Sequence, residues 1–304
     1  MRILITGVAG FIGSNLAQYL IKKGYDVVGI DDLSYGVIEQ VPSDTEFHKI
    51  DILSEKIYPK FIGVDVVFHL AAKNCIPDCQ RDPLDTVRIN ILGSINVFEA
   101  CRKASINRII YAESSAIYEG SKIYPTPEND EKPESFYAIS KYAKSFFSKA
   151  YQRYYGLNPT ALRYFNVYGP RQDYRRSIPP LMSSIIINLL KKEKPKIYGD
   201  GSKRRDFIYV DDVNRFHEIL LTNKKSYNRV FNIGTGINYS VNEIYSIIDS
   251  ILKTNIKPIY FEDLPGEAFQ NLANIDNAKS LGWEPKVNYE ELIEIMMKDA
   301  IENR

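Results

Sequence analysis

The sequence predicts an α/β fold with a doubly wound parallel sheet, because strand-like and helix-like segments alternate through its first half. Apolar segments with the length of strands lie at 2–6, 26–30, 46–50, 65–71, 108–113 and 160–166. Two longer stretches with helical periodicity lie at about 83–104 and 135–155. A glycine-rich turn also follows the first strand directly, as is typical of sheets of this kind.

Beyond residue 168 the alternation is less regular, and a smaller lobe is expected there. Its predicted elements are a helix near 181–191, a GDGS turn at 199–202, a strand at 229–233 and helices at 240–252 and 289–301. We expect residues 1–167, joined by 206–235, to form the larger domain. Residues 168–304 would mainly form a C-terminal substrate-binding lobe, interleaved with the sheet.

Composition excludes several classes of protein. A net charge of +1 over 304 residues gives no general attraction to nucleic acid or to a membrane surface. No apolar run reaches the roughly 18 residues of a membrane span, and Met1 leads directly into a strand rather than a signal peptide. Cys75, Cys79 and Cys101 have no accompanying histidine cluster, so we expect reduced thiols, no metal and a cytoplasmic protein.

The glycine-rich turn predicts a dinucleotide site. Gly7, Gly10 and Gly13 stand between the first strand and a helix, and Asp31 ends the second strand. Glycines allow the backbone to approach a pyrophosphate, which the helix N-terminus attracts. A carboxylate at Asp31 would bind the adenosine ribose hydroxyls and repel a 2′-phosphate, so the expected cofactor of this Rossmann domain is NAD rather than NADP.

A second group of residues predicts acid–base chemistry. Ser114 lies at the end of a core strand, where open α/β sheets bind their ligands. Tyr137 and Lys141 are four residues apart on a predicted helix and therefore share a face. A nearby ammonium group lowers the pKa of a tyrosine from about 10 towards working pH. Tyr137 is thus a candidate general base and acid.

Seven motifs together resemble the extended short-chain dehydrogenase/reductase family of NAD-dependent nucleotide-sugar epimerases and dehydratases, over nearly the whole chain. They are GVAGFIG (7–13), HLAA (69–72), SSAIY (114–118), YAISK (137–141), RYFNVYGPRQ (163–172), GDGSKRRDFIYVDDV (199–213) and LGWEP (281–285). The resemblance implies tightly held NAD and a UDP-sugar or similar nucleotide-sugar substrate. It also implies a homodimer formed by two helices of each subunit.

The resemblance also implies roles for individual residues. Those implied to bind NAD are Gly7, Gly10, Phe11, Ile12, Gly13, Asp31, Asp51, Ile52, Leu70, Ala71, Ala72, Tyr137 and Lys141. Those implied to bind the substrate are Ser114, Ser115, Tyr137, Asn166, Arg205 and Asn271. Ser114, Tyr137 and Lys141 would be catalytic. Asn271 matches the position that limits the size of the 2-substituent, and its small side chain would admit an N-acetyl group.

The implied reaction is epimerisation at C4 through a transient 4-keto sugar. Ser115 and Ala116 stand where 4,6-dehydratases have an acid pair, which disfavours that elimination. Glu113 and Glu119 leave open a dehydratase with a different elimination, such as 5,6-dehydration, and a 4-keto-sugar reductase is a further alternative. Leu264 replaces a phosphate-binding arginine of the family, so this diphosphate anchor is either missing or supplied by Arg171, Arg175 or Arg176.

Overall fold

The computed structural model describes residues 1–172, 179–263 and 268–286 of the chain. Its core is a seven-stranded sheet with the order β10-β6-β5-β4-β1-β2-β3, and every neighbouring pair of strands is parallel. The strands are β1 (Arg2–Thr6), β2 (Asp26–Asp31), β3 (Glu46–Lys49), β4 (Val66–His69), β5 (Arg108–Ser114), β6 (Asn158–Tyr164) and β10 (Arg229–Ile233). The predicted doubly wound α/β fold is therefore confirmed.

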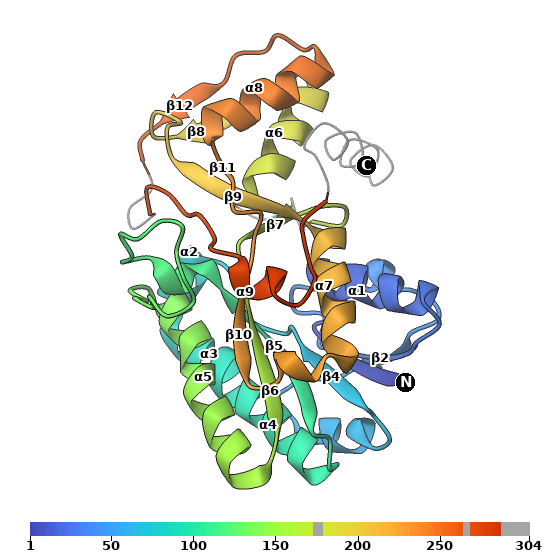
Figure 1. Cartoon of the computed structure of the whole chain (residues 1–304). Coiled ribbons are helices and arrows are strands. Elements are labelled where there is room, and N and C mark those ends of the chain that lie inside the picture. Colours follow the sequence, from blue (N-terminus) through green and yellow to red (C-terminus); the bar gives the residue numbers. More distant parts are fainter. Residues whose placement is uncertain (173–178, 264–267, 287–304) are drawn as a thin grey trace.

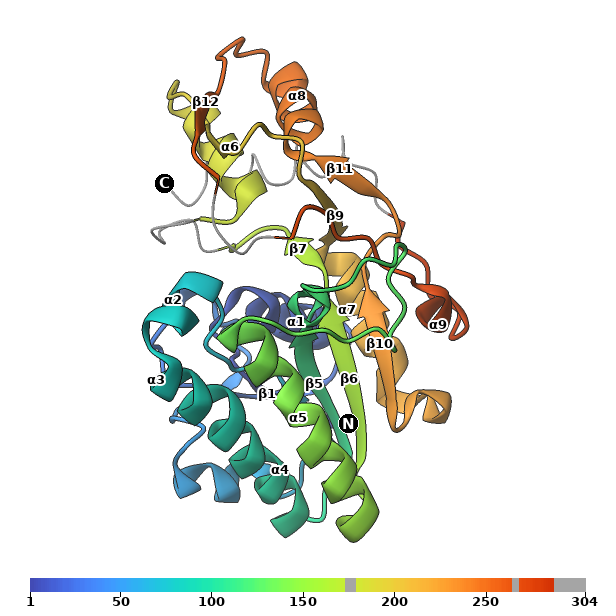
Figure 2. The same cartoon turned by 90° about the vertical axis from the view of Figure 1, so that its left-hand side faces the viewer.

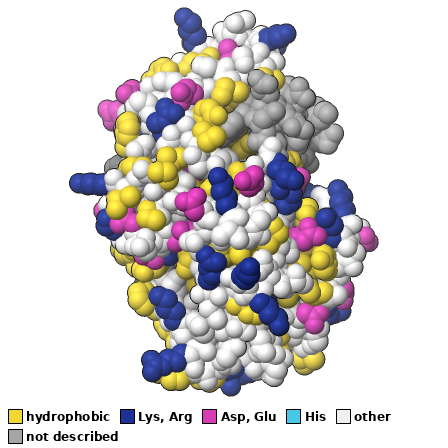
Figure 3. Space-filling view, viewed as in Figure 1, with side chains coloured by type: hydrophobic (Ala, Val, Ile, Leu, Met, Phe, Trp, Pro, Cys, Tyr) yellow, Lys and Arg dark blue, Asp and Glu magenta, His cyan; other side chains and the backbone are white. Residues whose placement is uncertain are grey.

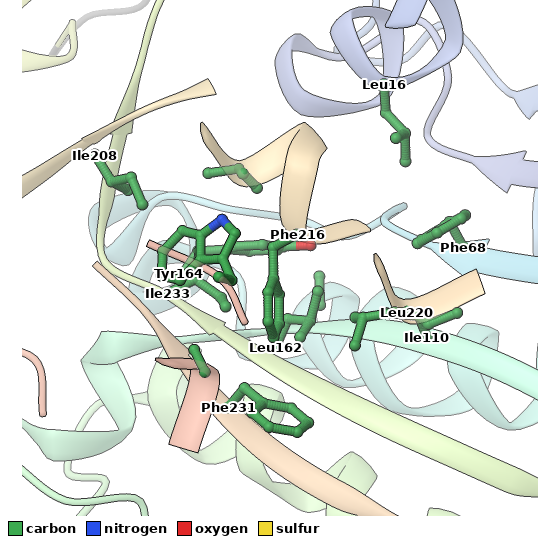
Figure 4. Packing of buried hydrophobic residues seen from close by; sticks show 14 of the residues in the cluster. Leu16, Phe68, Ile110, Leu162, Tyr164, Ile208, Phe216, Leu220, Phe231 and Ile233 are labelled. Carbon is green, nitrogen blue, oxygen red and sulfur yellow. The ribbon is translucent and has the colours of Figure 1, made fainter. Parts of the chain in front are cut away.

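Helices cover both faces of this sheet (Figures 1 and 2). On one face lie α1 (Phe11–Lys22) and α7 (Val210–Thr222), and on the other lie α4 (Ser94–Lys103) and α5 (Phe136–Tyr155). Successive strand residues alternate between the two faces: Ile3 and Ile5 pack with α1, whereas Leu4 packs with α4. Figure 4 shows the first of these clusters, in which Phe216 lies among side chains from several strands.

The smaller lobe contains two short sheets and two helices. The three-stranded sheet has the order β11-β9-β7, and the two-stranded sheet pairs β12 with β8. Their bounds are β7 (Asn166–Tyr168), β8 (Lys196–Tyr198), β9 (Arg204–Tyr209), β11 (Asn238–Ser240) and β12 (Ile259–Phe261). The helices α6 (Leu181–Leu190) and α8 (Val241–Leu252) pack on each other, and α9 (Asp276–Lys279) returns to β10.

Several sequence predictions need correction. The predicted helix at 83–104 is three segments: α3 (Pro83–Val87), a π-helical segment (Arg88–Gly93) and α4, with the short α2 (Ile76–Arg81) before them. The strand predicted at 160–166 ends at Tyr164. The backbone N–H of Phe165 still donates to the carbonyl of Ile233, and the chain then leaves the sheet to form β7. The predicted helix at 289–301 lies outside the described residues.

The described part of the chain contains no helix that combines the length and apolar composition of a membrane span. On the face seen in Figure 3, basic and acidic side chains are interspersed over both lobes.

Candidate functional site

A cleft of about 1190 Å³ lies at the carboxyl ends of the parallel strands, between the large sheet and the smaller lobe. It brings together most of the predicted site residues. Those that line it are Gly7, Gly10, Phe11, Ile12, Gly13, Asp31, Asp51, Ile52, Leu70, Ala71, Ala72, Ser114, Tyr137, Lys141, Asn166 and Arg205. Ser115 and Asn271 are not among the described residues that line it.

The turn between β1 and α1 has no room for a side chain at Gly7 or Gly13. Gly7 has φ +76°, and a Cβ there would lie 2.7 Å from the backbone nitrogen of Ala71. A Cβ on Gly13 would lie 2.9 Å from Gly7 C and from Val8 Cα, and closer still to Gly7 O. No side chain caps the N-terminus of α1, so its first N–H groups are available to an anion. This cradle fits the pyrophosphate of NAD.

Asp31 lines the cleft at the end of β2. Its carboxylate accepts hydrogen bonds from the backbone N–H groups of Ala9 (3.0 Å) and Leu33 (2.9 Å). Burial raises the pKa of this carboxyl group above its ordinary value. The two bonds fix the carboxylate at the end of β2, beside the glycine turn, which is the position that the sequence motif predicts for a ribose contact.

Ser114 and Tyr137 enter the cleft from adjacent elements. Ser114 is the last residue of β5, and its hydroxyl accepts a hydrogen bond from the N–H of Ala116 at 3.2 Å. Tyr137 lies in the first turn of α5, which begins after Ser135; the Ser135 hydroxyl caps it by accepting from the N–H of Ala138 at 3.1 Å. The strand end and the helix start thus present two hydroxyl groups to the same cleft.

Lys141 lies one helical turn beyond Tyr137 and is buried beneath it. Its Nζ is 5.5 Å from the centroid of the Tyr137 ring. Burial lowers the pKa of Lys141 to about 8, against opposing contributions from Cys79 and Glu113. At neutral pH the ammonium is still charged, so it can stabilise a phenolate on Tyr137. The arrangement can therefore move a proton to and from a hydroxyl group of a bound ligand.

Asn166 and Arg205 line the part of the cleft next to the smaller lobe. The Asn166 amide donates to the carbonyl of Asp206 (2.9 Å) and to Oδ1 of Asn271 (3.2 Å). The same Oδ1 accepts from the backbone N–H of Asp206 at 2.8 Å. Asn271 does not line the cleft itself but bonds to the Asn166 amide, and so fixes the orientation of that side chain.

Glu113 and Glu119, which the sequence left open as acids for an elimination, are both engaged in structural contacts. Glu113 Oε2 pairs with Nε of Arg163 at 2.8 Å, and its Oε1 accepts from the Ser145 hydroxyl. Glu119 accepts from the N–H (2.8 Å) and hydroxyl (2.8 Å) of Ser135 and so anchors the start of α5. Both carboxylates are therefore held by other residues, which disfavours a lyase.

Several basic residues of the cleft were not predicted to be binding residues. Lys191, Lys196 and Lys203 line it from the smaller lobe, as does Arg171, which the sequence had suggested as a phosphate ligand. Lys191 and Lys196 lie outside the motifs, and Lys203 lies in a run of three basic residues within one of them, where the sequence does not show which side chain faces a ligand. Leu264, Arg175 and Arg176 lie outside the described residues.

Comparison with known proteins agrees with this geometry. A profile of the NAD dependent epimerase/dehydratase family matches residues 3–234. The chain belongs to this family, which confirms the resemblance stated from the motifs and NAD as the expected cofactor. A putative UDP-glucose 4-epimerase of Methanocaldococcus jannaschii is 39% identical over 295 residues, which are 95% of each chain.

Two solved structures have the same fold over the whole chain. A UDP-N-acetylglucosamine 4-epimerase of Methanobrevibacter ruminantium, in complex with UDP-N-acetylmuramic acid, has a TM-score of 0.95 at 32% identity and covers 100% of this chain and 99% of its own. A UDP-glucuronic acid 4-epimerase of Bacillus cereus, in complex with UDP-glucuronic acid and NAD, has a TM-score of 0.91 at 31% identity and covers 100% of both chains.

Proposed function

We propose that this protein is an NAD-dependent epimerase that inverts C4 of a UDP-sugar. The observation that supports this most directly is that Ser114, Tyr137 and Lys141 meet in one cleft with the dinucleotide turn. The three relatives compared above are named as 4-epimerases of UDP-sugars, which supports the same reaction.

NAD would occupy the half of the cleft beside the large sheet. The turn from Gly7 to Gly13 would hold the pyrophosphate, Asp31 and Asp51 would lie at the adenosine end, and Lys141 would contact the nicotinamide ribose. When bound, NAD supplies reversible oxidation at C4 of the sugar. In this proposal residues 1–167 with 206–235 form the NAD-binding domain, and residues 168–304 mainly bind the nucleotide sugar.

The residues of the chain itself would move the proton. Tyr137 would take the proton of the 4-hydroxyl group, helped by the positive charge of Lys141, and later return it. The Ser114 hydroxyl would hydrogen-bond the same oxygen and orient the sugar. Because the transient 4-keto sugar stays in one closed site, its release to solvent is avoided.

The diphosphate of the substrate would lie against the smaller lobe. Between residues 166 and 241, the charged residues that line the cleft in the described part of the chain are all basic. They are Arg171, Lys191, Lys196, Lys203 and Arg205. A wall of one sign of charge favours a dianionic ligand. We propose that some of this charge replaces the arginine that the family has at Leu264.

We further propose that the sugar site accepts an N-acetyl group at C2. The small side chain of Asn271 lies directly behind Asn166 and leaves more room than a tyrosine would. Kinetic comparison of UDP-glucose with UDP-N-acetylglucosamine tests this, with Asn271→Tyr as the matched variant. The idea fails if the N-acetyl substrate reacts equally poorly with both forms.

We also propose that the chain forms a homodimer through α5 and the neighbouring residues 83–93, which are α3 and the π-helical segment. Figure 2 shows α3 and α5 next to each other. Apolar side chains are exposed on both: Ile139 (48%), Phe146 (62%), Tyr154 (69%), Leu84 (80%) and Leu92 (54%). Apolar exposure of this extent typically marks an interface. Sedimentation should give a dimer for the natural chain and a monomer for Phe146→Glu.

A cytoplasmic location is part of the proposal, supported by three free cysteines.

Incubation with UDP-glucose or UDP-N-acetylglucosamine and catalytic NAD, followed by proton NMR of the sugar, tests the reaction. Appearance of the C4 epimer with no net change in NAD is the expected result. Olefinic or keto signals would instead indicate a dehydratase, and stoichiometric consumption of reduced cofactor would indicate a 4-keto-sugar reductase.

A further inference from the structure

A buried group of ionisable side chains lies behind the catalytic pair, and the proposed reaction does not account for it. It consists of Glu113, Lys144 and Arg163, whose residues are 2%, 1% and 0% exposed. We call these three residues the Glu113 cluster. Buried charges are costly unless they are paired, so their position next to a catalytic site calls for a physical reason.

The cluster joins α5 to the end of β5. Lys144 donates to the carbonyl oxygen of Ala112, and Ser145 donates to the carboxylate of Glu113. Ala112 and Glu113 are the two residues of β5 that precede Ser114, while Lys144 and Ser145 lie about one helical turn after Lys141. These two bonds therefore set the position of Tyr137 and Lys141 along α5 relative to Ser114.

Glu113 is held firmly in this place by β6. Nε of Arg163 lies 2.8 Å from Glu113 Oε2, and Nη2 of Arg163 lies 2.8 Å from Glu131 Oε1. Arg163 also donates to the hydroxyl of Tyr118 at 2.7 Å. With both of its oxygens bonded, the Glu113 carboxylate has a fixed orientation within the surrounding core.

The groups that face Lys141 come from every element packed around it. They are Cys79 of α2, His69 of β4, Glu113 of β5, and Tyr137 and Lys144 of α5 itself. Burial raises the pKa of the Cys79 thiol and holds the pKa of His69 well below its ordinary value, so both are neutral where Lys141 titrates. Of these facing groups, Glu113 is the one held in an ion pair, with Arg163 of β6.

We propose that Glu113 is a positioning residue for the catalytic pair: it fixes α5 against β5 and keeps the buried ammonium of Lys141 charged. The proposal rests on Tyr137 and Lys141 being the catalytic pair of the proposed function. Without the carboxylate, α5 would lose its bond to β5 at Ser145, and the buried ammonium of Lys141 would lose a nearby opposite charge.

Glu113→Gln removes the charge and keeps the shape of the side chain. The first measurement is an NMR titration of the protein labelled with ¹³C at the lysine side chains, in which the Lys141 signal is identified by its loss in Lys141→Met. The midpoint should fall by about one pH unit in Glu113→Gln, because loss of a nearby opposite charge lowers the pKa of a buried ammonium group. This readout needs neither substrate nor turnover.

The second measurement is the pH dependence of epimerisation. Its alkaline limb should move down by the same amount in Glu113→Gln, with kcat reduced about tenfold above that limb and KM little changed. Glu113→Asp keeps the charge and should keep the midpoint. Ser145→Ala keeps the charge but removes the bond to α5, so it should lower kcat without moving the midpoint.

Ser148→Ala is the matched control, since it removes a hydrogen bond between the same helix and the same strand, to Tyr111, without touching an ionised group. It should leave the midpoint and the limb unchanged. If Glu113→Gln does not fold, the titration compares Glu113→Gln/Arg163→Met with Arg163→Met, so that the two proteins differ only in the charge at Glu113. The proposal is overturned if the Lys141 midpoint stays within about 0.2 pH units of the natural value when the Glu113 charge is lost. That limit is roughly the precision of such a titration and lies far below the expected shift. Absence of epimerisation with a shifted midpoint would refute the proposed function alone.

Discussion

The glycine turn offers the sharpest test of how the sequence builds the cofactor site, through the pair Gly13→Ala and Gly10→Ala. A Cβ on Gly10 would meet Gly7 O at 3.3 Å, a tight contact that a small adjustment relieves. A Cβ on Gly13 would lie 2.9 Å from two backbone atoms of the same turn and closer still to Gly7 O. Backbone cannot rotate away as a side chain can, so the turn itself must move.

The magnitude follows from two opposing effects. Alanine in a helix is favoured over glycine by about 1 kcal/mol, whereas overpacking against a fixed backbone costs roughly 3 kcal/mol. The clash wins, and Gly13→Ala should lower the free energy of unfolding by roughly 2 kcal/mol, or Tm by about 3 °C for a chain of this size. A displacement of the turn near 1 Å should weaken NAD binding by about two orders of magnitude.

Thermal unfolding and calorimetric titration with NAD measure both effects. Gly10→Ala should change the free energy of unfolding by less than about 1 kcal/mol, so its Tm should change correspondingly little. It should also keep most of the NAD affinity. The reasoning is refuted if Gly13→Ala unfolds at the same temperature as Gly10→Ala and binds NAD equally tightly, because the steric difference between the two positions would then have no consequence.

Three further changes probe the site. Asp31→Asn removes the charge that would repel a 2′-phosphate, so NADP should bind the variant at least about tenfold more tightly than it binds the natural chain. The ratio of the NADP dissociation constants of the two proteins measures this. Tyr137→Phe should lower kcat by about 10²–10⁴-fold with UDP-sugar binding retained, and a smaller loss would rule out Tyr137 as the proton carrier. Glu119→Gln should lower stability by about 1 kcal/mol through loss of the anchor at Ser135, with kcat within about fivefold; a larger loss of kcat would revive the lyase alternative.

The sequence predicts the parts of this fold that depend on local pattern. The strands at 2–6 and 229–233 have the bounds expected, because apolar runs between turn residues define buried strands without outside help. The turn at Gly7 and the position of Asp31 also follow from local chemistry, since a positive φ and a strand end are properties of a few consecutive residues.

What the sequence could not predict depends on contacts between distant residues. The π-helical segment inside 83–104 is one case: the amide of Asn90 bonds to both the N–H and the carbonyl of Lys73, and Gly93 packs against Ile52. Those contacts widen one turn of a helix whose own residues give no such signal. The Glu113 cluster has the same origin, whereas α7 has a local helical pattern of buried residues that the sequence reading did not include.

Lys144 illustrates why single-sequence reading fails for such residues. A lysine in the middle of a helix is ordinarily a surface residue, and its burial here follows from an acceptor on β5, the Ala112 carbonyl, that only the folded chain supplies. Glu113 was weighed as an acid for the same reason, because its partner Arg163 lies 50 residues further along the chain.

The strand order has a consequence for how the chain folds during synthesis. β6 lies between β5 and β10, and β10 begins at Arg229, more than 60 residues after β6 ends at Tyr164. A nascent chain therefore exposes one open hydrogen-bonding edge of β6 while the ribosome makes the whole intervening segment. That interval is when the polypeptide is most open to pairing with the wrong strand, and shielding of this edge by chaperones or by slow translation would matter most there.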